Sequence, residues 1–170
     1  MSKNFKIQPE IISSYANFSK CGKYRYYLRR FWNTGEKHVM FIGLNPSTAT
    51  ASTDDPTIRR CINFAKSWGY AGMYMCNLYA YISTDPKKLI ISGEEIAVTN
   101  SYLRECAGFV DIIVFAWGAF ELHKKRMNEI IEMFPAAYCI KHTKNGYPSH
   151  PLYLKSDLKP IPFLQKCKYF

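Results

Sequence analysis

The sequence of 170 residues lacks the features that would place it in several familiar classes. Its six cysteines are scattered, no Cys-x-x-Cys pair occurs, and no cysteine–histidine spacing fits a zinc site. We therefore expect reduced thiols, no metal and no cofactor. The N-terminus has no apolar signal stretch, and no apolar run is long enough to span a bilayer. These absences predict a cytoplasmic protein that does not bind membranes.

Repeats, low-complexity tracts and linkers rich in Pro, Gly or Ser are also missing, and the length fits a single domain. Within residues 1–170 we expect a basic, aromatic N-terminal extension over 1–38, an α/β core over 39–154 and a C-terminal tail over 155–170. The sequence gives no indication of the oligomeric state.

Acidic residues are scarce, with 13 Asp and Glu against 23 Lys and Arg, and the net charge is +10. An excess of this size makes a polyanion such as DNA a plausible partner, although a basic protein without such a partner has the same composition. Aromatic residues are frequent, and 13 of the 27 are tyrosines, which suit wet edges of a core or stacking on flat ligands.

The most basic segment is residues 20–37, where tyrosines alternate with Lys and Arg. This pattern predicts a β-hairpin with its turn at residues 33–35. The basic side chains either bind a polyanion or form a solvated strand face.

Apolar runs and helical periodicities alternate along the rest of the chain. Strands are expected at 38–44, 71–81, 110–118 and 136–142, and helices at 55–70, 92–109 and 119–134, the second beginning with a capping-box pattern at Ser92. This alternation predicts an α/β domain with a mostly parallel sheet and helices on both faces. Ligands of such sheets bind beyond the carboxyl ends of the strands, so the loops that start at Asn45, Asn77, Trp117 and His142 are the candidate site.

Four short segments at these places occur in an order that resembles the uracil-DNA glycosylase superfamily. They are "FIGLNPS" at 41–47, "CNLYA" at 76–80, "FAWG" at 115–118 and "SHPLYL" at 149–154. The resemblance implies a three-layer α/β/α fold with a central four-stranded, mostly parallel sheet, to which the N-terminal hairpin is added. It also implies hydrolysis of an N-glycosidic bond in DNA or in a nucleotide.

The same resemblance implies roles for individual residues. Asn45 would position a water molecule, Asn77 would read the edge of the base, and His150 would donate a hydrogen bond to the departing base. The remaining residues expected to contact the substrate are Gly43, Pro46, Ser47, Trp117, and Leu152 or Tyr153, one of which would wedge into the base stack. The chain differs from the glycosylase pattern at Ser47 and at Leu152.

The segment "STDDPTIRR" at 52–60 has no counterpart in those enzymes. Asp54 and Asp55 are candidates for the carboxylate that activates water, while Asp55 also suits the N-cap of the helix that begins at Pro56. Arg59 and Arg60 either bind a phosphate near that helix N-terminus or pair with the neighbouring aspartates. Lys144 either approaches a phosphate or only completes the turn at 143–146.

The chain also resembles, more closely, a family of bacterial and phage proteins catalogued as a domain of unknown function. "LNPSTA" at 44–49, "DDPTIRRC" at 54–61 and "HPLYL" at 150–154 carry that likeness. Three functions therefore stay open: a glycosylase-like hydrolase, a non-catalytic module that binds nucleic acid or a modified base, and an enzyme acting on a small nucleotide.

Overall fold

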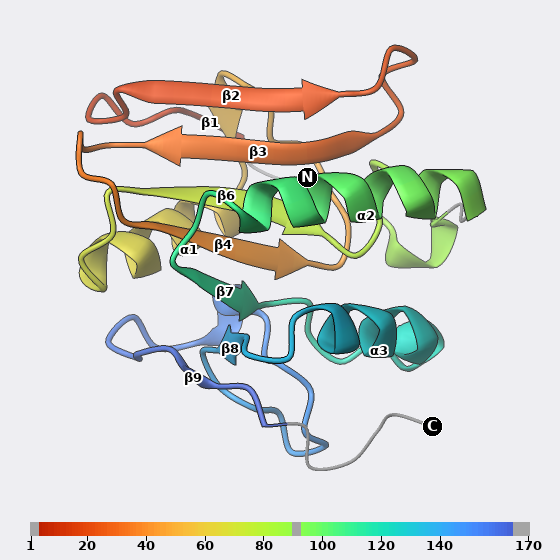
Figure 1. Cartoon of the computed structure of the whole chain (residues 1–170). Helices are drawn as coiled ribbons and strands as arrows, with labels where there is room; N and C mark the ends of the chain where they lie inside the picture. The colour runs from red at the N-terminus through yellow and green to blue at the C-terminus, as the bar shows by residue number, and fades with distance from the viewer. Residues whose placement is uncertain (1–3, 90–92, 165–170) are drawn as a thin grey trace.

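The computed structural model describes residues 4–89 and 93–164 (Figure 1). Among these residues a seven-stranded sheet runs in the order β2-β3-β6-β4-β7-β8-β9, and β1 pairs with β5 in a separate two-stranded sheet. The strands are β1 (Phe5–Lys6), β2 (Ser13–Phe18), β3 (Arg25–Phe31), β4 (His38–Gly43), β5 (Thr53–Asp54), β6 (Gly72–Asn77), β7 (Ile112–Phe115), β8 (Tyr138–Cys139) and β9 (Ile161–Pro162).

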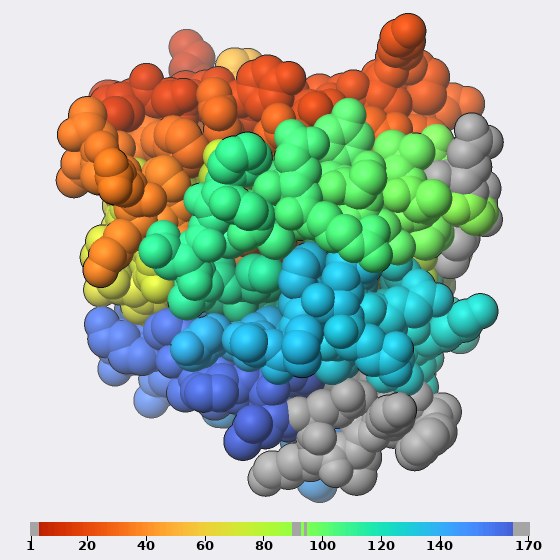
Figure 2. All heavy atoms as spheres, viewed as in Figure 1, coloured from red at the N-terminus to blue at the C-terminus, as the bar shows by residue number. Residues whose placement is uncertain are grey.

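Three α-helices are described: α1 (Pro56–Ser67), α2 (Gly93–Ala107) and α3 (Lys124–Met133). Short 3-10 turns lie at η1 (Pro86–Lys88), η2 (Glu121–His123) and η3 (Pro151–Tyr153). Helices α2 and α3 lie in front of the sheet in Figure 1, and α1 lies behind it. Figure 2 shows α2 and α3 covering the front face between the N-terminal strands and the C-terminal segments. No helix in the described part of the chain is both long and apolar enough to cross a membrane.

The sheet is mixed, which overturns the predicted four-stranded, mostly parallel sheet of a glycosylase-like three-layer α/β/α fold. Strands β6, β4, β7 and β8 pair in parallel, but β2 with β3, β3 with β6, and β8 with β9 are antiparallel. The prediction failed because the N-terminal and C-terminal segments add strands to both edges. An uncovered edge exposes unpaired backbone groups, and pairing with β3 and β9 satisfies them.

The N-terminal hairpin exists, but its turn is not at residues 33–35. Strand β2 pairs with β3, and the chain reverses between them at residues 19–24, where the Ser19 amide donates to the Tyr24 carbonyl (3.0 Å). The basic, aromatic segment is therefore one strand, β3, paired on its other side with β6. Residues 33–35 instead connect β3 to β4, and the Gly35 amide donates to the Asn33 side chain (3.2 Å).

The two central strands carry the core. Every residue of β6 is buried, as is every residue of β4 after His38, which explains their continuous apolar sequences. Alternate side chains point to opposite faces. Met40 and Ile42 pack with α2 and α3, whereas Val39 and Phe41 pack with α1. The paired register brings Gly43 beside Asn77 at the carboxyl ends of both strands.

The predicted helices are present with different bounds. The Asp55 side chain caps α1 by accepting a hydrogen bond from the Ile58 amide (2.9 Å), and Pro56 occupies the first helical position. The capping residue proposed for α2, Ser92, lies outside the described residues. The expected helix at 119–134 begins with the separate turn η2, and the expected strand at 136–142 is only β8, because the chain turns away to pair His142 with Pro148.

Candidate functional site

A cavity of about 170 Å³ lies where β4 and β6 end, beside the first turn of α1. Each of the four loops that were predicted to form the site contributes at least one residue to this cavity. Its walls are formed by Arg25, Gly43, Leu44, Asn45, Ser47, Asp55, Thr57, Ile58, Met75, Asn77, Ser83, Thr84, Pro86, Trp117, Phe120 and His150. A second cavity of about 600 Å³ shares the walls at Phe120 and His150. The first cavity therefore contains seven of the fourteen site residues that the sequence indicated: Gly43, Asn45, Ser47, Asp55, Asn77, Trp117 and His150.

The side chain of Asn45 is held in one orientation. Its Nδ2 donates to the backbone carbonyls of Ser83 (2.8 Å) and Pro46 (3.0 Å), and the Ser83 amide donates back to the Pro46 carbonyl (3.0 Å). Two carbonyl acceptors identify this end of the amide as the nitrogen. The Oδ1 atom is then the end available to accept a hydrogen bond from water or a ligand.

Asn77, at the end of β6, is 3% exposed, and its Oδ1 has no hydrogen-bond partner among the described residues. Gly43 explains how the amide fits there. A Cβ atom at position 43 would lie 2.9 Å from Asn77 Nδ2 and 2.8 Å from Met75 Cε, closer than such contacts allow. Glycine at the end of β4 therefore leaves the space that the Asn77 amide occupies.

Trp117 and Gly118 follow β7 and place the loop that carries His150. Trp117 is fully buried, and its Nε1 has no partner in the described chain. Gly118 has a φ of 81°, a left-handed conformation that favours glycine, and its amide donates to the Pro148 carbonyl (2.9 Å). A Cβ at position 118 would lie 3.6 Å from the Cβ of His150. The turn after β7 is thus packed directly against the η3 loop.

His150 caps η3, and its Nδ1 accepts a hydrogen bond from the Leu152 amide (3.3 Å). An accepting Nδ1 requires the hydrogen to be on Nε2, so the neutral ring is a donor through Nε2. Burial lowers the pKa of His150, and the carboxylate of Asp55 partly opposes this shift. The imidazole is therefore neutral at neutral pH.

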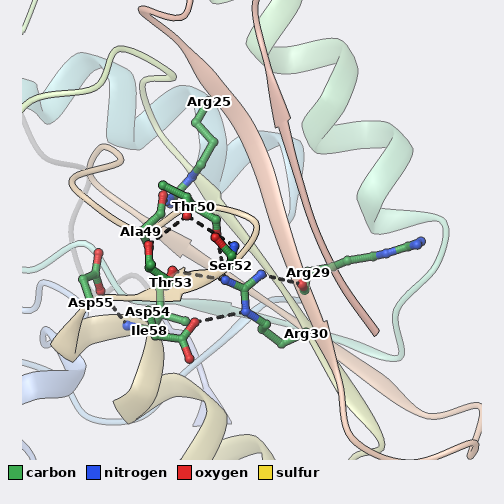
Figure 3. Close-up of polar contacts among 10 residues, drawn as sticks. All are labelled: Arg25, Arg29, Arg30, Ala49, Thr50, Ser52, Thr53, Asp54, Asp55 and Ile58. Atoms are coloured by element: carbon green, nitrogen blue, oxygen red, sulfur yellow. Dashed lines mark hydrogen bonds and ion pairs between the residues drawn. The ribbon is translucent and has the colours of Figure 1, made fainter. Parts of the chain in front are cut away.

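The two adjacent aspartates have different surroundings (Figure 3). Asp54 is fully buried and faces Arg30, whose Nε lies 3.0 Å from its Oδ1. Asp54 is not among the residues lining the cavity, whereas Asp55 is. Only Asp55 is therefore placed to act on a ligand, while one of its oxygens also caps α1.

Arg25, at the start of β3, is the charged residue among the cavity residues that the sequence analysis missed. It is 2% exposed, and its Nη1 donates to the Ala49 carbonyl (3.0 Å). Its Nε has no partner, and it forms no ion pair with any described residue. Burial lowers the pKa of Arg25 to about 10, which leaves the guanidinium charged at neutral pH.

A β-bulge accounts for the position of Arg25. Asn17 of β2 pairs with Tyr27, but the next residue, Phe18, pairs with Arg25, so Tyr26 is an extra residue in β3. Such an extra residue reverses the alternation of side chains beyond it. Without the bulge, Arg25 would face away from the cavity.

Ring contacts support this account. Tyr26 and Tyr27 are consecutive, yet both contact Tyr102 of α2, with ring centroids 4.5 and 6.0 Å away. Arg25 and Arg30 are five residues apart, yet both reach the 49–54 loop on the other face (Figure 3). Adjacent tyrosines that break the alternation of β3 were the signal in the sequence that could have indicated the bulge.

Comparison with known proteins identifies the family. A family model described as "Protein of unknown function (DUF1643)" matches residues 25–152. The chain belongs to the DUF1643 family. Searches of curated proteins and of solved structures give no match, so the glycosylase resemblance stays a prediction. The DUF1643 match contains every residue that lines the cavity.

The two arginines expected to bind phosphate in this DUF1643 protein have contacts elsewhere. Arg60 donates from Nε to the Pro151 carbonyl (3.4 Å) and from Nη2 to the Leu154 carbonyl, which ties η3 to α1. The Arg59 guanidinium lies over the ring of Phe5, 4.4 Å from its centroid. Neither lines the cavity, and their observed contacts stabilise neighbouring segments.

The remaining predicted residues lie at or beyond the rim. Pro46 is buried and does not line the cavity. Lys144 and Tyr153 line the second cavity, and Tyr153 is 86% exposed. Leu152 is 39% exposed and lines neither cavity. Of the two candidates for the wedge, Leu152 and Tyr153, only Tyr153 lines a cavity, and it is the second one.

Proposed function

We propose that the cavity binds a nucleobase of DNA or of a nucleotide and hydrolyses its N-glycosidic bond. The observation that carries the proposal is the set of buried polar groups left without partners. Among the described residues, three residues of this one cavity each have such an atom: Arg25 Nε, Asn77 Oδ1 and Trp117 Nε1. Buried polar groups in folded proteins are normally hydrogen-bonded, so three in one cavity point to a polar ligand.

The pattern of donors and acceptors suits a flat heterocycle. Asn77 offers an acceptor, Oδ1, next to a donor, Nδ2, which matches a ring edge that carries both an N–H and a carbonyl. Trp117 and His150 add N–H donors, and the small volume restricts the ligand to a compact group. This combination fits the edge of a nucleobase.

Hydrolysis requires a placed water and a stabilised leaving group. Asn45 Oδ1 accepts a hydrogen bond from water, and Asp55 is the cavity carboxylate that can take its proton. The water oxygen forms a bond to the sugar carbon while the C–N bond breaks, and its electron pair leaves with the base. His150 Nε2–H stabilises that developing anion, and the base then takes up a proton from solvent.

The test is base release from a panel of DNAs and nucleotides with normal and modified bases, measured as alkali-labile sites or as free base. We expect Asn45→Ala and His150→Ala to lower the rate by about a hundredfold or more, as for loss of a placed donor or water-positioning group. Asn33→Ala, in the exposed loop before β4, is the matched control and should leave the rate unchanged. Unaltered base release in both site variants would remove this mechanism.

A non-catalytic binding module is the second candidate. The observation that favours it is that the Asn45 amide cannot take a proton, while Asp55 Oδ1 already accepts the cap bond of α1. Binding of a modified base without its release, weakened in Asn77→Ala, would support this candidate over the hydrolase.

A further inference from the structure

Arg25 is a buried cation without a counter-ion in contact. Its guanidinium makes one hydrogen bond, to the Ala49 carbonyl, and its Nε is unpartnered in the described chain. Removing a charge from water without pairing it is strongly unfavourable, and such groups normally lie against an opposite charge. A guanidinium that lines a cavity and is not fully hydrogen-bonded can donate to an oxyanion.

The first turn of α1 adds a second favourable feature. Thr57 and Ile58, at the N-terminal end of this 12-residue helix, line the same cavity as Arg25. The N-terminal end of a helix carries a partial positive charge that favours anions. The hydroxyl-bearing residues Ser47 and Thr84 also line the cavity and can donate to an oxygen atom.

Two other ionisable groups face this space. His150 is neutral at neutral pH and adds no charge. Asp55 also lines the cavity, and its carboxylate acts electrostatically on Arg25. It compensates part of the Arg25 charge and repels an incoming anion. The arrangement therefore predicts that neutralising Arg25 lowers the affinity for an anion and that neutralising Asp55 raises it.

We propose that Arg25 is the anchor of a phosphate subsite in this cavity, so that the ligand is a phosphate-bearing nucleobase compound rather than a free base or a nucleoside. The nucleobase part of this statement rests on the proposed function, whereas the oxyanion part rests on Arg25 and the start of α1. The phosphate is either the terminal group of a free nucleotide or a diester in a nucleic acid strand.

The experiment measures binding by calorimetry for four kinds of probe: inorganic phosphate, nucleosides, the matching nucleoside 5′-monophosphates, and short single-stranded oligonucleotides. We expect a nucleotide or oligonucleotide to bind at least about tenfold more tightly than the nucleoside, as for a charge-assisted hydrogen bond. Tighter binding of monophosphates than of oligonucleotides identifies a free nucleotide, and the reverse order identifies a strand. Equal binding of nucleoside and phosphorylated probes, or no binding of any probe, overturns the subsite.

Variants assign the effect to the cavity. Arg25→Gln should abolish the preference for the phosphorylated probe, and Asp55→Asn, which keeps a capping side chain, should increase affinity for it. Arg29→Gln is the matched control, because Arg29 lies on the same strand but over the rings of Tyr15 and Phe31. If Arg25→Gln does not fold, the increase in Asp55→Asn still decides the question, and unchanged affinity there contradicts the proposal.

The two proposals fail in different ways. Inorganic phosphate that binds as tightly as every nucleotide, in an Arg25-dependent manner, would retain the oxyanion subsite and remove the nucleobase function. Nucleosides that bind as well as nucleotides, with no change in Arg25→Gln or Asp55→Asn, would retain the nucleobase site and remove the phosphate subsite.

Discussion

Arg25 and Arg30 are buried guanidinium groups on the same face of β3, and they differ in how completely the protein satisfies them (Figure 3). Each nitrogen of Arg30 has a partner: Asp54 at Nε, and the backbone carbonyls of residues 29, 50 and 53 at the other two. Among the described residues, the Ala49 carbonyl is the one hydrogen-bond partner of the Arg25 guanidinium. The Arg30 guanidinium holds the 49–54 loop against the sheet, whereas the Arg25 guanidinium lines a cavity and is not fully hydrogen-bonded.

This difference separates a structural charge from a ligand-binding one. A buried arginine in which every nitrogen is already hydrogen-bonded has little left to offer a ligand, and its removal is expressed as lost stability. A buried arginine with unused donors contributes less to the fold, and its removal is expressed as lost binding. The same distinction holds for their neighbours, since Asp54 faces Arg30 and Asp55 faces the cavity.

The largest expected effect comes from breaking the ion pair between Arg30 and Asp54. Arg30→Met leaves the Asp54 carboxylate buried and unpaired, which should lower the free energy of unfolding by about 3–5 kcal/mol. Arg25→Met loses one hydrogen bond, so its loss should be no more than about 1.5 kcal/mol. Urea denaturation measures both, with Arg29→Met as the control. Equal losses for the two variants would contradict the distinction between the two arginines.

The next largest effect concerns the space that Gly43 leaves beside the Asn77 amide in the cavity wall. Gly43→Ala places a methyl group 2.9 Å from Asn77 Nδ2 and 2.8 Å from Met75 Cε, so both side chains must move. We expect a loss of about 1–3 kcal/mol in unfolding free energy, as for an overpacked core, together with weaker ligand binding. Gly93→Ala is the control, because no described atom outside its own helix backbone and its chain neighbours would lie within 4 Å of its added Cβ. Wild-type ligand binding in Gly43→Ala would show that the Asn77 amide is not needed.

The sequence predicted the residues that line the cavity better than it predicted the strand pairing and the distant contacts. Asn45, Asn77 and Trp117 line one cavity because parallel strands end at a common edge, and the ends of strands can be recognised from apolar runs followed by Asn-Pro or Gly. Their meeting depends only on local patterns and on that rule, whereas His150 reaches the same cavity through the contacts of the η3 loop with Gly118 and Arg60. The cap formed by Asp55 was predicted for the same local reason.

What could not be predicted depends on distant partners. The antiparallel pairing of β3 with β6 and of β8 with β9 is decided by which edges need covering, so the predicted parallel sheet was wrong. The contact of Arg60 with Leu154 spans 94 residues and leaves no local pattern. The position of Arg25 depends on one extra residue in β3, which reverses the side chains beyond it.

A smaller effect tests the two functions of Asp55. Asp55→Ala removes the N-cap of α1 and should lower the free energy of unfolding by about 1 kcal/mol, whereas Asp55→Asn should leave it nearly unchanged because asparagine also caps well. Both variants remove the carboxylate from the cavity. Thermal or urea unfolding measures the contribution of the cap, and base release measures the contribution of the carboxylate to the reaction. Base release that survives in Asp55→Asn but falls in Asp55→Ala would mean that Asp55 serves the fold alone.

The smallest effect is the titration of His150. Burial lowers its pKa below the ordinary value of about 6.5, so the folded protein binds this proton more weakly than the unfolded chain does. The contribution of the neutral ring to stability is complete above pH 6.5 and is lost as the pH falls through the lowered folded-state pKa. Protonation of Nδ1 also breaks the hydrogen bond from the Leu152 amide, so η3 should loosen in the same pH range. An NMR titration of the four histidine rings, assigned with His150→Gln, measures this, and a His150 midpoint at or above 6.5 would mean that the ring is not the neutral Nε2–H donor that the open site requires.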